Sequence, residues 1–304
     1  MEKNPSITVV IPVYNGEQFL TETINSILQQ SHRDFELLLI NDGSKDGSLQ
    51  LLRSFTDPRI RIVDQENMGL VETLNKGIQM AKADLIARLD QDDISKPARL
   101  ENQLRAMEKY DLDVVYTQVE KFGAKNSWDN RERQTEKPGE VVVVKPLEYG
   151  CQLNSTLLAK KEVLLQHLYR KEYYPCDDWD LQLRLEASCR VGILQEKLLH
   201  YRFHESANTY PTFFTMQEKR RWCENNAIRR MNGQPEQSLE EYKKQQTSRY
   251  KNWNRRRKDL YFYHFRMGGD SYLQGRYLKM VKHMLIAVPL APEKILKRVT
   301  GKAI

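Results

Sequence analysis

The sequence predicts an α/β protein in which a mostly parallel sheet is covered by helices on both faces. Two observations support this class. Short runs of apolar and β-branched residues alternate with segments whose apolar residues recur at helical spacing, as Phe19, Ile24, Ile27 and Leu28 do. The runs are continuously apolar, which is typical of strands buried on both faces of a parallel sheet. In such sheets, ligands bind beyond the carboxyl ends of the strands.

The predicted elements of the first half follow one another along the chain. Strands are expected at residues 7–13, 35–41, 59–64, 84–90 and 113–119, and helices at 17–30, 48–55, 69–83 and 97–110.

Residues 124–140 are polar and turn-rich, and we expect a loop there. Beyond it, strands are expected at 140–146, 154–159 and 197–204, with helices beginning at Lys161 and spanning 176–187. Further helices are expected at 215–231 and 239–267, and an apolar stripe flanked by lysines follows at 275–299. We therefore divide the chain into an α/β domain, residues 1–210, and a basic helical region, residues 211–304.

Composition separates these two parts. Residues 211–304 carry 21 Lys and Arg against 8 Asp and Glu, a net of +13 in a chain whose total is +7. The two parts are expected to face different partners. No apolar run reaches the roughly 20 residues that span a bilayer, and no secretory signal is evident, so we expect a cytoplasmic location. The four cysteines lack metal-site spacing and are expected to be reduced thiols.

Three polar segments follow predicted strands: "PVYNG" at 12–16, "NDGSKDG" at 41–47 and "DQDD" at 90–93. Because the carboxyl ends of parallel strands meet at one edge, we expect these segments to line one crevice.

Negative charge is concentrated in the third segment, where Asp90, Asp92 and Asp93 fall within four residues. Carboxylates this close raise one another's pKa unless positive charge lies among them. Asp90 and Asp92 share one face of a strand, and Mg²⁺ or Mn²⁺ prefers such oxygen ligands together with substrate phosphates. The pattern predicts a metal site for a diphosphate. The alternative is that the acids cap the following helix, which is a common role for Asp93 alone.

Five motifs in order resemble the family-2 inverting glycosyltransferases of the GT-A fold. They are "VVIPVYNG", "INDGSKDGS", "NMGLVETLNKGI", "ARLDQDDIS" and "CDDWDLQLRL" with the later "YRFH". The resemblance covers about residues 5–210 and is closest to bacterial exopolysaccharide and surface-polysaccharide sugar transferases. It implies a nucleotide-diphosphate sugar as donor, with a UDP-sugar favoured, and a saccharide acceptor that is often lipid-linked.

The resemblance also implies roles for donor-binding residues. Pro12 and Tyr14 would shape and stack against the nucleobase, and Asp42 would accept a hydrogen bond from it. Asp90 would approach the ribose and the metal, and Asp92 would ligate the metal. Structural alternatives remain open for Tyr14 as a strand-end aromatic and for Asp42 as a turn acid.

Other positions carry less specific roles. Lys76 would help to neutralise phosphates, or it is a solvated lysine. His204 would touch the diphosphate or the metal, or it is a structural histidine.

The catalytic position that matches the family is Asp178, with Asp177 as second choice. Displacement at an anomeric carbon needs a base for the acceptor hydroxyl. The alternative is that both acids cap the helix. The sequence departs from the family at Asn154–Thr156, where close relatives often read His-Pro-Ser or His-Pro-Thr, and this puts the acceptor side in doubt.

The basic tail interleaves Arg255–Arg257 with aromatic residues, so residues 250–304 are expected to lie on an anionic membrane surface or to pack as a helical bundle. Nucleic-acid binding is not expected. Two competing classes, a sugar-phosphate nucleotidyltransferase and a non-catalytic scaffold of the same fold, fit less well. The first lacks its glycine-rich loop, and the second has no need of Asp42, Asp90, Asp92 and Asp178 together.

Overall fold

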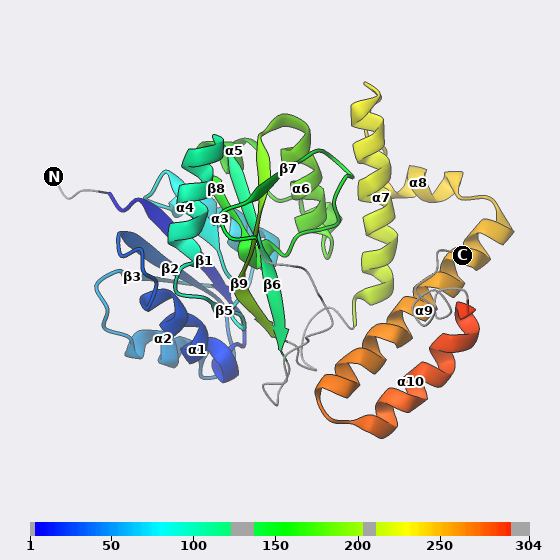
Figure 1. Cartoon of the computed structure of the whole chain (residues 1–304), viewed down its shortest axis with the longest axis horizontal. Coiled ribbons are helices and arrows are strands. Elements are labelled where there is room, and N and C mark those ends of the chain that lie inside the picture. Colours follow the sequence, from blue (N-terminus) through cyan, green and yellow to red (C-terminus); the bar gives the residue numbers. More distant parts are fainter. Residues whose placement is uncertain (1–3, 123–136, 203–210, 293–304) are drawn as a thin grey trace.

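The computed structural model describes residues 4–122, 137–202 and 211–292. One sheet runs through the α/β part in the order β3-β2-β1-β4-β8-β6-β9-β5, and β7 pairs with β9 off this path. The C-terminal helices lie to one side of the sheet and its covering helices (Figure 1). The predicted fold class, with its basic helical extension, is confirmed.

The first half of the sheet is entirely parallel. Its strands are β1 (Ile7–Val13), β2 (Phe35–Asp42), β3 (Ile60–Gln65) and β4 (Leu85–Arg88). They are connected by α1 (Glu17–Leu28), α2 (Ser48–Ser54) and α3 (Leu70–Met80). All seven elements occur where the sequence predicts them, to within a few residues at their ends.

The second half is mixed. A short strand, β8 (Leu158–Lys160), is antiparallel to both β4 and β6 (Val114–Phe122). Beyond it, β9 (Val191–Arg202) runs parallel to β6, while β7 (Val141–Val144) and β5 (Ile94–Ser95) are antiparallel to β9.

Successive side chains of the central strands enter two different cores, one on each face. In β1, Val9 and Ile11 pack with α1, α2 and α4 (Arg99–Tyr110). Val10 faces the other side and packs with α3, α5 (Lys161–Gln166) and α6 (Asp177–Ser188). This alternation explains why the strand is apolar at every position. The packing is close, since a Cβ on Gly77 of α3 would come within 2.5 Å of Val10 Cγ1.

The C-terminal region contains α7 (Phe213–Met231), α8 (Leu239–Gln245), α9 (Arg249–Leu273) and α10 (Tyr277–Leu290). The predicted helix 239–267 is therefore two helices, broken at residues 246–248. A third core joins α6 to α7, where Trp179 and Leu183 pack with Trp222 and Cys223. The two cysteines of this core, Cys176 and Cys223, are free thiols, as are the other two. No helix in the described ranges combines the length and apolarity that spanning a bilayer requires.

Two predicted strands differ in detail. The strand predicted at 154–159 opens with a 3₁₀ turn, Asn154–Thr156, before β8 begins. Its short polar side chains favour this turn, since the Thr156 hydroxyl donates to the Leu153 carbonyl at 2.7 Å. The strand predicted at 197–204 begins earlier, at Val191, and its last two residues lie outside the described ranges.

Candidate active site

The three strand-end segments meet in one place, as predicted. The backbone amide of Tyr14 donates to Gln91 Oε1 at 2.8 Å, and Gln91 Nε2 donates to the Tyr14 carbonyl at 3.0 Å. The Asn15 amide donates to Ser44 Oγ at 3.0 Å, and the Lys45 amide donates to Asn15 Oδ1 at 2.7 Å. Segment 12–16 is thereby tied to both 41–47 and 90–93, and we call the site lined by these segments the strand-end crevice.

Gly16 permits the closest of these approaches. A Cβ at this position would lie 2.4 Å from Gln91 Oε1, so any side chain would displace the glutamine that bridges the β1 and β4 loops. Gln91 is also held through its carbonyl, which accepts a hydrogen bond from the Thr23 hydroxyl of α1 at 2.9 Å.

Asp42 is buried at the end of β2 and organises the turn that precedes α3. Its carboxylate accepts hydrogen bonds from Gln65 Nε2 at 2.8 Å and from the amides of Met68 and Gly69 at 2.8 and 2.9 Å. Lys76 of α3 donates to Gln65 Oε1 at 2.7 Å, so the structure places Lys76 with Asp42. The turn-acid alternative therefore describes part of what Asp42 does.

A hollow of about 660 Å³ lies beside Asp42, lined by Gly43, Lys45, Asp64, Gln65, Glu66 and Asn67. Pro12 is buried within β1, opposite Ile40. Tyr14 follows at the strand end with 47% of its surface exposed, and its ring is accessible for stacking.

The acidic cluster, by which we mean Asp90, Asp92 and Asp93, places carboxylate oxygens of all three residues within 4.8 Å of one another. The positive charge that sequence analysis left unassigned comes from Arg88, a buried residue at the end of β4. Arg88 Nη2 lies 2.5 Å from Asp90 Oδ1, and the Ser155 hydroxyl donates to Asp90 Oδ2 at 2.5 Å. Burial raises the pKa of the Asp90 carboxyl, but Arg88 and Ser155 outweigh burial and hold it below its usual value.

Asp93 is compensated less well. It is fully buried, and burial, followed by the charges of Asp92 and Asp90, raises its pKa well above the usual value. One carboxylate oxygen accepts a hydrogen bond from the Arg202 amide at 3.1 Å, and the other has no hydrogen-bond partner in the part of the chain that the structure describes. Helix capping does not explain Asp93, because the N-cap of α4 is Ala98.

This donor set suits a hard divalent cation. Three carboxylates converge, Arg88 pairs with Asp90, and one buried oxygen of Asp93 has no hydrogen-bond donor among the residues that the structure describes. Mg²⁺ or Mn²⁺ would find oxygen ligands at Asp92 and Asp93, with Asp90 adjacent.

Arg202, at the end of β9, also holds the acidic cluster in position. Its Nε donates to the Asp92 carbonyl at 2.9 Å, and its Nη2 pairs with Glu22 of α1. The guanidinium stacks between the rings of Phe19 and Phe122, 4.7 and 4.6 Å from their centroids. These roles of Arg202, Arg88 and Ser155 were not predicted from the sequence.

The second group of acids begins α6. Asp177 is buried, and burial, with the charge of Asp178, raises its pKa to about 7. Asp178 is more exposed, and burial and the Asp90 charge raise its pKa against opposing effects of the Trp179 amide and Arg88. Both acids feel the charge of Arg88, so the first turn of α6 lies near the acidic cluster. The helix-capping alternative holds in part. The N-cap is Cys176, whose side chain makes no capping bond, but Asp178 Oδ1 accepts a hydrogen bond from the Trp179 amide in the first turn at 2.7 Å.

The segment that departs from the family pattern also supports this site. Ser155 links β8 to Asp90, and Asn154 exchanges hydrogen bonds with the buried Tyr169 hydroxyl at 2.8 and 3.0 Å. Two other predicted features, His204 and most of the 124–140 loop, lie outside the described residues.

Comparison with known proteins identifies the family. The family model "Glycosyl transferase family 2" matches residues 8–174, more than half of the chain. The chain belongs to glycosyltransferase family 2. The O-antigen biosynthesis glycosyltransferase WbnJ of Escherichia coli is 31% identical over 208 residues, which cover 66% of this chain and 81% of WbnJ. An uncharacterized glycosyltransferase of Haemophilus influenzae is 28% identical over 225 residues, 67% of each chain.

The fold is shared with a solved structure. The crystal structure of Staphylococcus aureus TarS 1–349 in complex with UDP-GlcNAc superposes with a TM-score of 0.59 at 14% identity, covering 98% of this chain and 92% of that one. The GT-A fold is thereby established for this member of the family.

Replacing Asp177 with Asn should remove one pH-dependent contribution to the free energy of unfolding. The folded-state pKa of Asp177, about 7, lies above its ordinary value of 3.8, so the folded protein holds a proton that the unfolded chain has lost. The contribution of Asp177 to the stability of the wild type should therefore fall as pH rises from about 4 to 7. Over this pH range, the free energy of unfolding of Asp177→Asn should rise relative to that of the wild type by up to about 4 kcal/mol.

Urea unfolding at pH 4.5, 6 and 7.5 measures this difference. A stability difference that does not change with pH would contradict the assignment of a raised pKa to Asp177.

Proposed function

We propose that this protein is an inverting glycosyltransferase that moves a sugar from a UDP-sugar donor to a saccharide acceptor in bacterial surface-polysaccharide synthesis. The observation that carries the proposal is that Arg88 pairs with Asp90 of the acidic cluster and also acts on the charges of the acid pair that begins α6. The name of WbnJ supports the pathway class, and the UDP-GlcNAc complex of TarS supports the donor class.

Donor binding would use both sides of the crevice. The uracil ring would stack on Tyr14 above Pro12, beside the Asp42 turn and the adjacent hollow, with Lys76 on the same side. The acidic cluster would hold Mg²⁺ or Mn²⁺, chiefly through Asp92 and Asp93. Such an ion supplies positive charge for the donor diphosphate and for the departing nucleotide.

Asp178 is the proposed base. It is more accessible than Asp177, and its raised pKa makes it a better proton acceptor than an ordinary aspartate. The acceptor hydroxyl would give its proton to an Asp178 oxygen while its own oxygen attacks the anomeric carbon from the side opposite the diphosphate. This single displacement inverts the anomeric configuration. Buried Asp177 would keep a proton near neutral pH and so limit repulsion beside the base.

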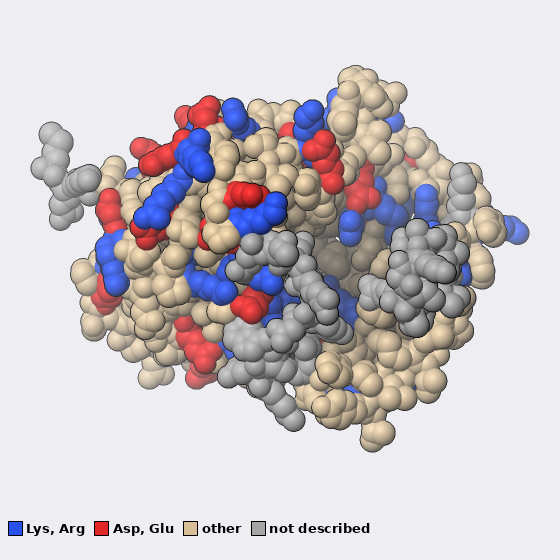
Figure 2. Space-filling view, in the orientation of Figure 1, with Lys and Arg blue, Asp and Glu red and all other residues tan. Residues whose placement is uncertain are grey.

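The acceptor is proposed to be lipid-linked, with the C-terminal region on the inner face of the cell membrane. Apolar residues of α10 are exposed, among them Leu278 at 90% and Leu285 at 71%. Trp253 of α9 is exposed next to Arg257, whose guanidinium lies 5.7 Å from its ring. Figure 2 shows Lys and Arg side chains along the border between the α/β part and the C-terminal helices. Exposed apolar and basic residues together suit an anionic bilayer surface.

Asp92→Ala should remove metal-dependent nucleotide binding. UDP at a hundredfold excess over its dissociation constant should stabilise the wild type by about 2.7 kcal/mol in Mn²⁺, and much less in chelator. Thermal unfolding with UDP measures both. Asp111→Ala, which changes an aspartate whose side chain is 90% exposed, is the matched control. If Mn²⁺ increases the stabilisation by UDP as much in Asp92→Ala as in the control, Asp92 is not part of the metal site.

Asp178→Asn should lower the transfer rate at least about 100-fold, because the acceptor hydroxyl loses its base, while UDP binding stays nearly unchanged. Radiolabelled sugar transfer and thermal shift measure the two effects. An inactive Asp177→Asn beside an active Asp178→Asn would show that the other carboxylate is the base.

Replacing Arg255, Arg256 and Arg257 with Ser should weaken binding to anionic vesicles roughly tenfold or more, since each basic residue near the surface contributes about 1 kcal/mol. Sedimentation with phosphatidylglycerol vesicles at low salt measures the effect. Ser replacements of Arg53, Lys82 and Arg105 in the α/β part remove equal charge and should change little. Equal sedimentation of the wild type with anionic and with neutral vesicles would contradict the membrane proposal.

A further inference from the structure

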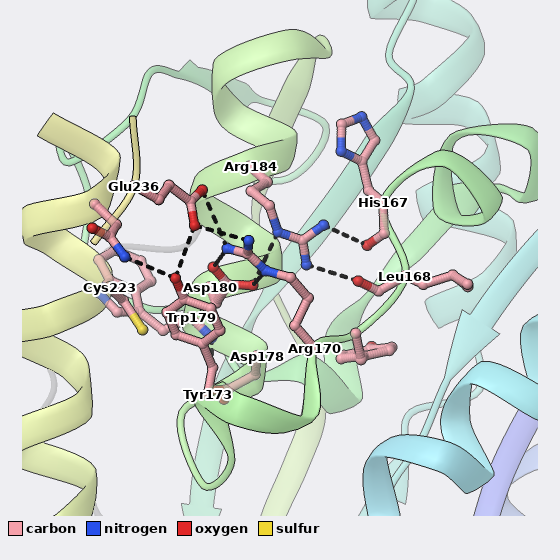
Figure 3. Close-up of polar contacts among 12 residues, drawn as sticks. His167, Leu168, Arg170, Tyr173, Asp178, Trp179, Asp180, Arg184, Cys223 and Glu236 are labelled. Atoms are coloured by element: carbon pink, nitrogen blue, oxygen red, sulfur yellow. Dashed lines mark hydrogen bonds and ion pairs between the residues drawn. The ribbon is translucent and has the colours of Figure 1, made fainter. Parts of the chain in front are cut away.

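Glu236, from the connection between α7 and α8, reaches toward the segment that leads into α6 (Figure 3). Its carboxylate accepts hydrogen bonds from Arg170 Nη1 at 2.9 Å and from the Tyr173 hydroxyl at 3.0 Å. Arg230 of α7 pairs with its other oxygen at 2.5 Å. These cations outweigh burial and lower the pKa of Glu236, so it is charged at neutral pH.

Arg170 connects Glu236 to α6. Its Nε donates to Asp180 Oδ2 at 2.9 Å, and its Nη2 pairs with Asp180 Oδ1. Asp180 is fully buried and also accepts from Arg184 Nε at 2.9 Å. Arg184 is fixed in turn by the carbonyls of His167 and Leu168, at 2.8 and 2.9 Å. Each charge of this network thus has a partner, which a buried ionic network requires.

Asp180 lies in the first turn of α6, two residues after Asp178. The network therefore fixes the turn that carries the proposed base. The aromatic ring of Tyr173 strengthens the support, since it stacks on Trp222 of α7 at 4.0 Å and lies 4.4 Å below the Arg170 guanidinium. Asn226 of α7 donates to the Tyr173 hydroxyl at 2.9 Å.

We propose that Glu236 is a positioning residue for sugar transfer, acting through Arg170 and Asp180 on the first turn of α6. The C-terminal helical region then completes the active site in addition to any role at a membrane. The inference rests on the proposed function, because it takes Asp178 as the base. Proton transfer requires hydrogen-bond reach, and a displacement of about 1 Å can cost a hundredfold in rate.

Glu236→Gln should remove the charge that holds Arg170 while keeping size and shape. UDP release from an equimolar mixture of UDP-glucose, UDP-galactose, UDP-GlcNAc and UDP-GalNAc, with water as acceptor, is the rate assay. We expect kcat to fall about tenfold or more, with KM for the donor mixture within twofold of wild type. Unchanged kcat would overturn the proposal.

Two variants control for general damage. Glu218→Gln removes another ion pair of the same region, the 2.9 Å contact between α7 and Lys243 of α8, and should leave kcat unchanged. Tyr173→Phe removes one contact of Glu236 without a change of charge and should lower kcat in the same direction by a smaller factor. It carries the test if Glu236→Gln fails to fold.

Hydrogen–deuterium exchange of peptides that cover residues 176–181 gives a readout that needs no turnover. Exchange there should be at least tenfold faster in Glu236→Gln and unchanged in Glu218→Gln. Equal exchange in both variants would overturn the proposal. An active Asp178→Asn would instead show that the assignment of the base has failed, whereas an inactive Asp178→Asn beside a fully active Glu236→Gln would reject only the positioning role.

Discussion

The buried guanidinium of Arg88 is the constraint on which the arrangement of the crevice depends. It pairs with Asp90 and exerts a favourable charge effect on Asp177 and Asp178, which come from a distant part of the chain. Without a central cation, the carboxylates beyond the end of β4 and those at the start of α6 would repel one another in a poorly solvated space. The three carboxylates that converge beyond β4 make this place suitable for a cation.

Much of the α/β architecture could be predicted, because the spacing of apolar residues along the chain follows which side chains are buried. Val9 and Ile11 are buried on one face of the sheet and Val10 on the other, so each position requires an apolar residue. The polar segments mark where the strands end. The mixed half of the sheet was harder to predict. Strand β8 has only three residues, and nothing in so short a run distinguishes parallel from antiparallel pairing.

The candidate site shows the same division between local and distant signals. Arg88 and Asp90 stand two residues apart, so opposite charges close along the chain provided a local signal of their pairing. Ser155, Arg202 and Glu236 act on partners 65, 110 and 66 residues away, and no spacing rule predicts such contacts. The phosphate role of Lys76, assigned by resemblance, stays a prediction. In the structure its ammonium donates to Gln65, which in turn donates to Asp42.

The close approach of Gly16 to Gln91 joins the loop that follows β1 to the loop that follows β4. The first loop carries the aromatic ring proposed for the nucleobase, and the second carries the carboxylates proposed for the diphosphate end. Because a shift of one loop must strain the other, binding of the nucleobase and binding of the diphosphate would not be energetically independent. The free energies with which uridine and pyrophosphate bind separately should then fail to add up to that of the intact nucleotide, and the shortfall or excess would measure the stiffness of this junction.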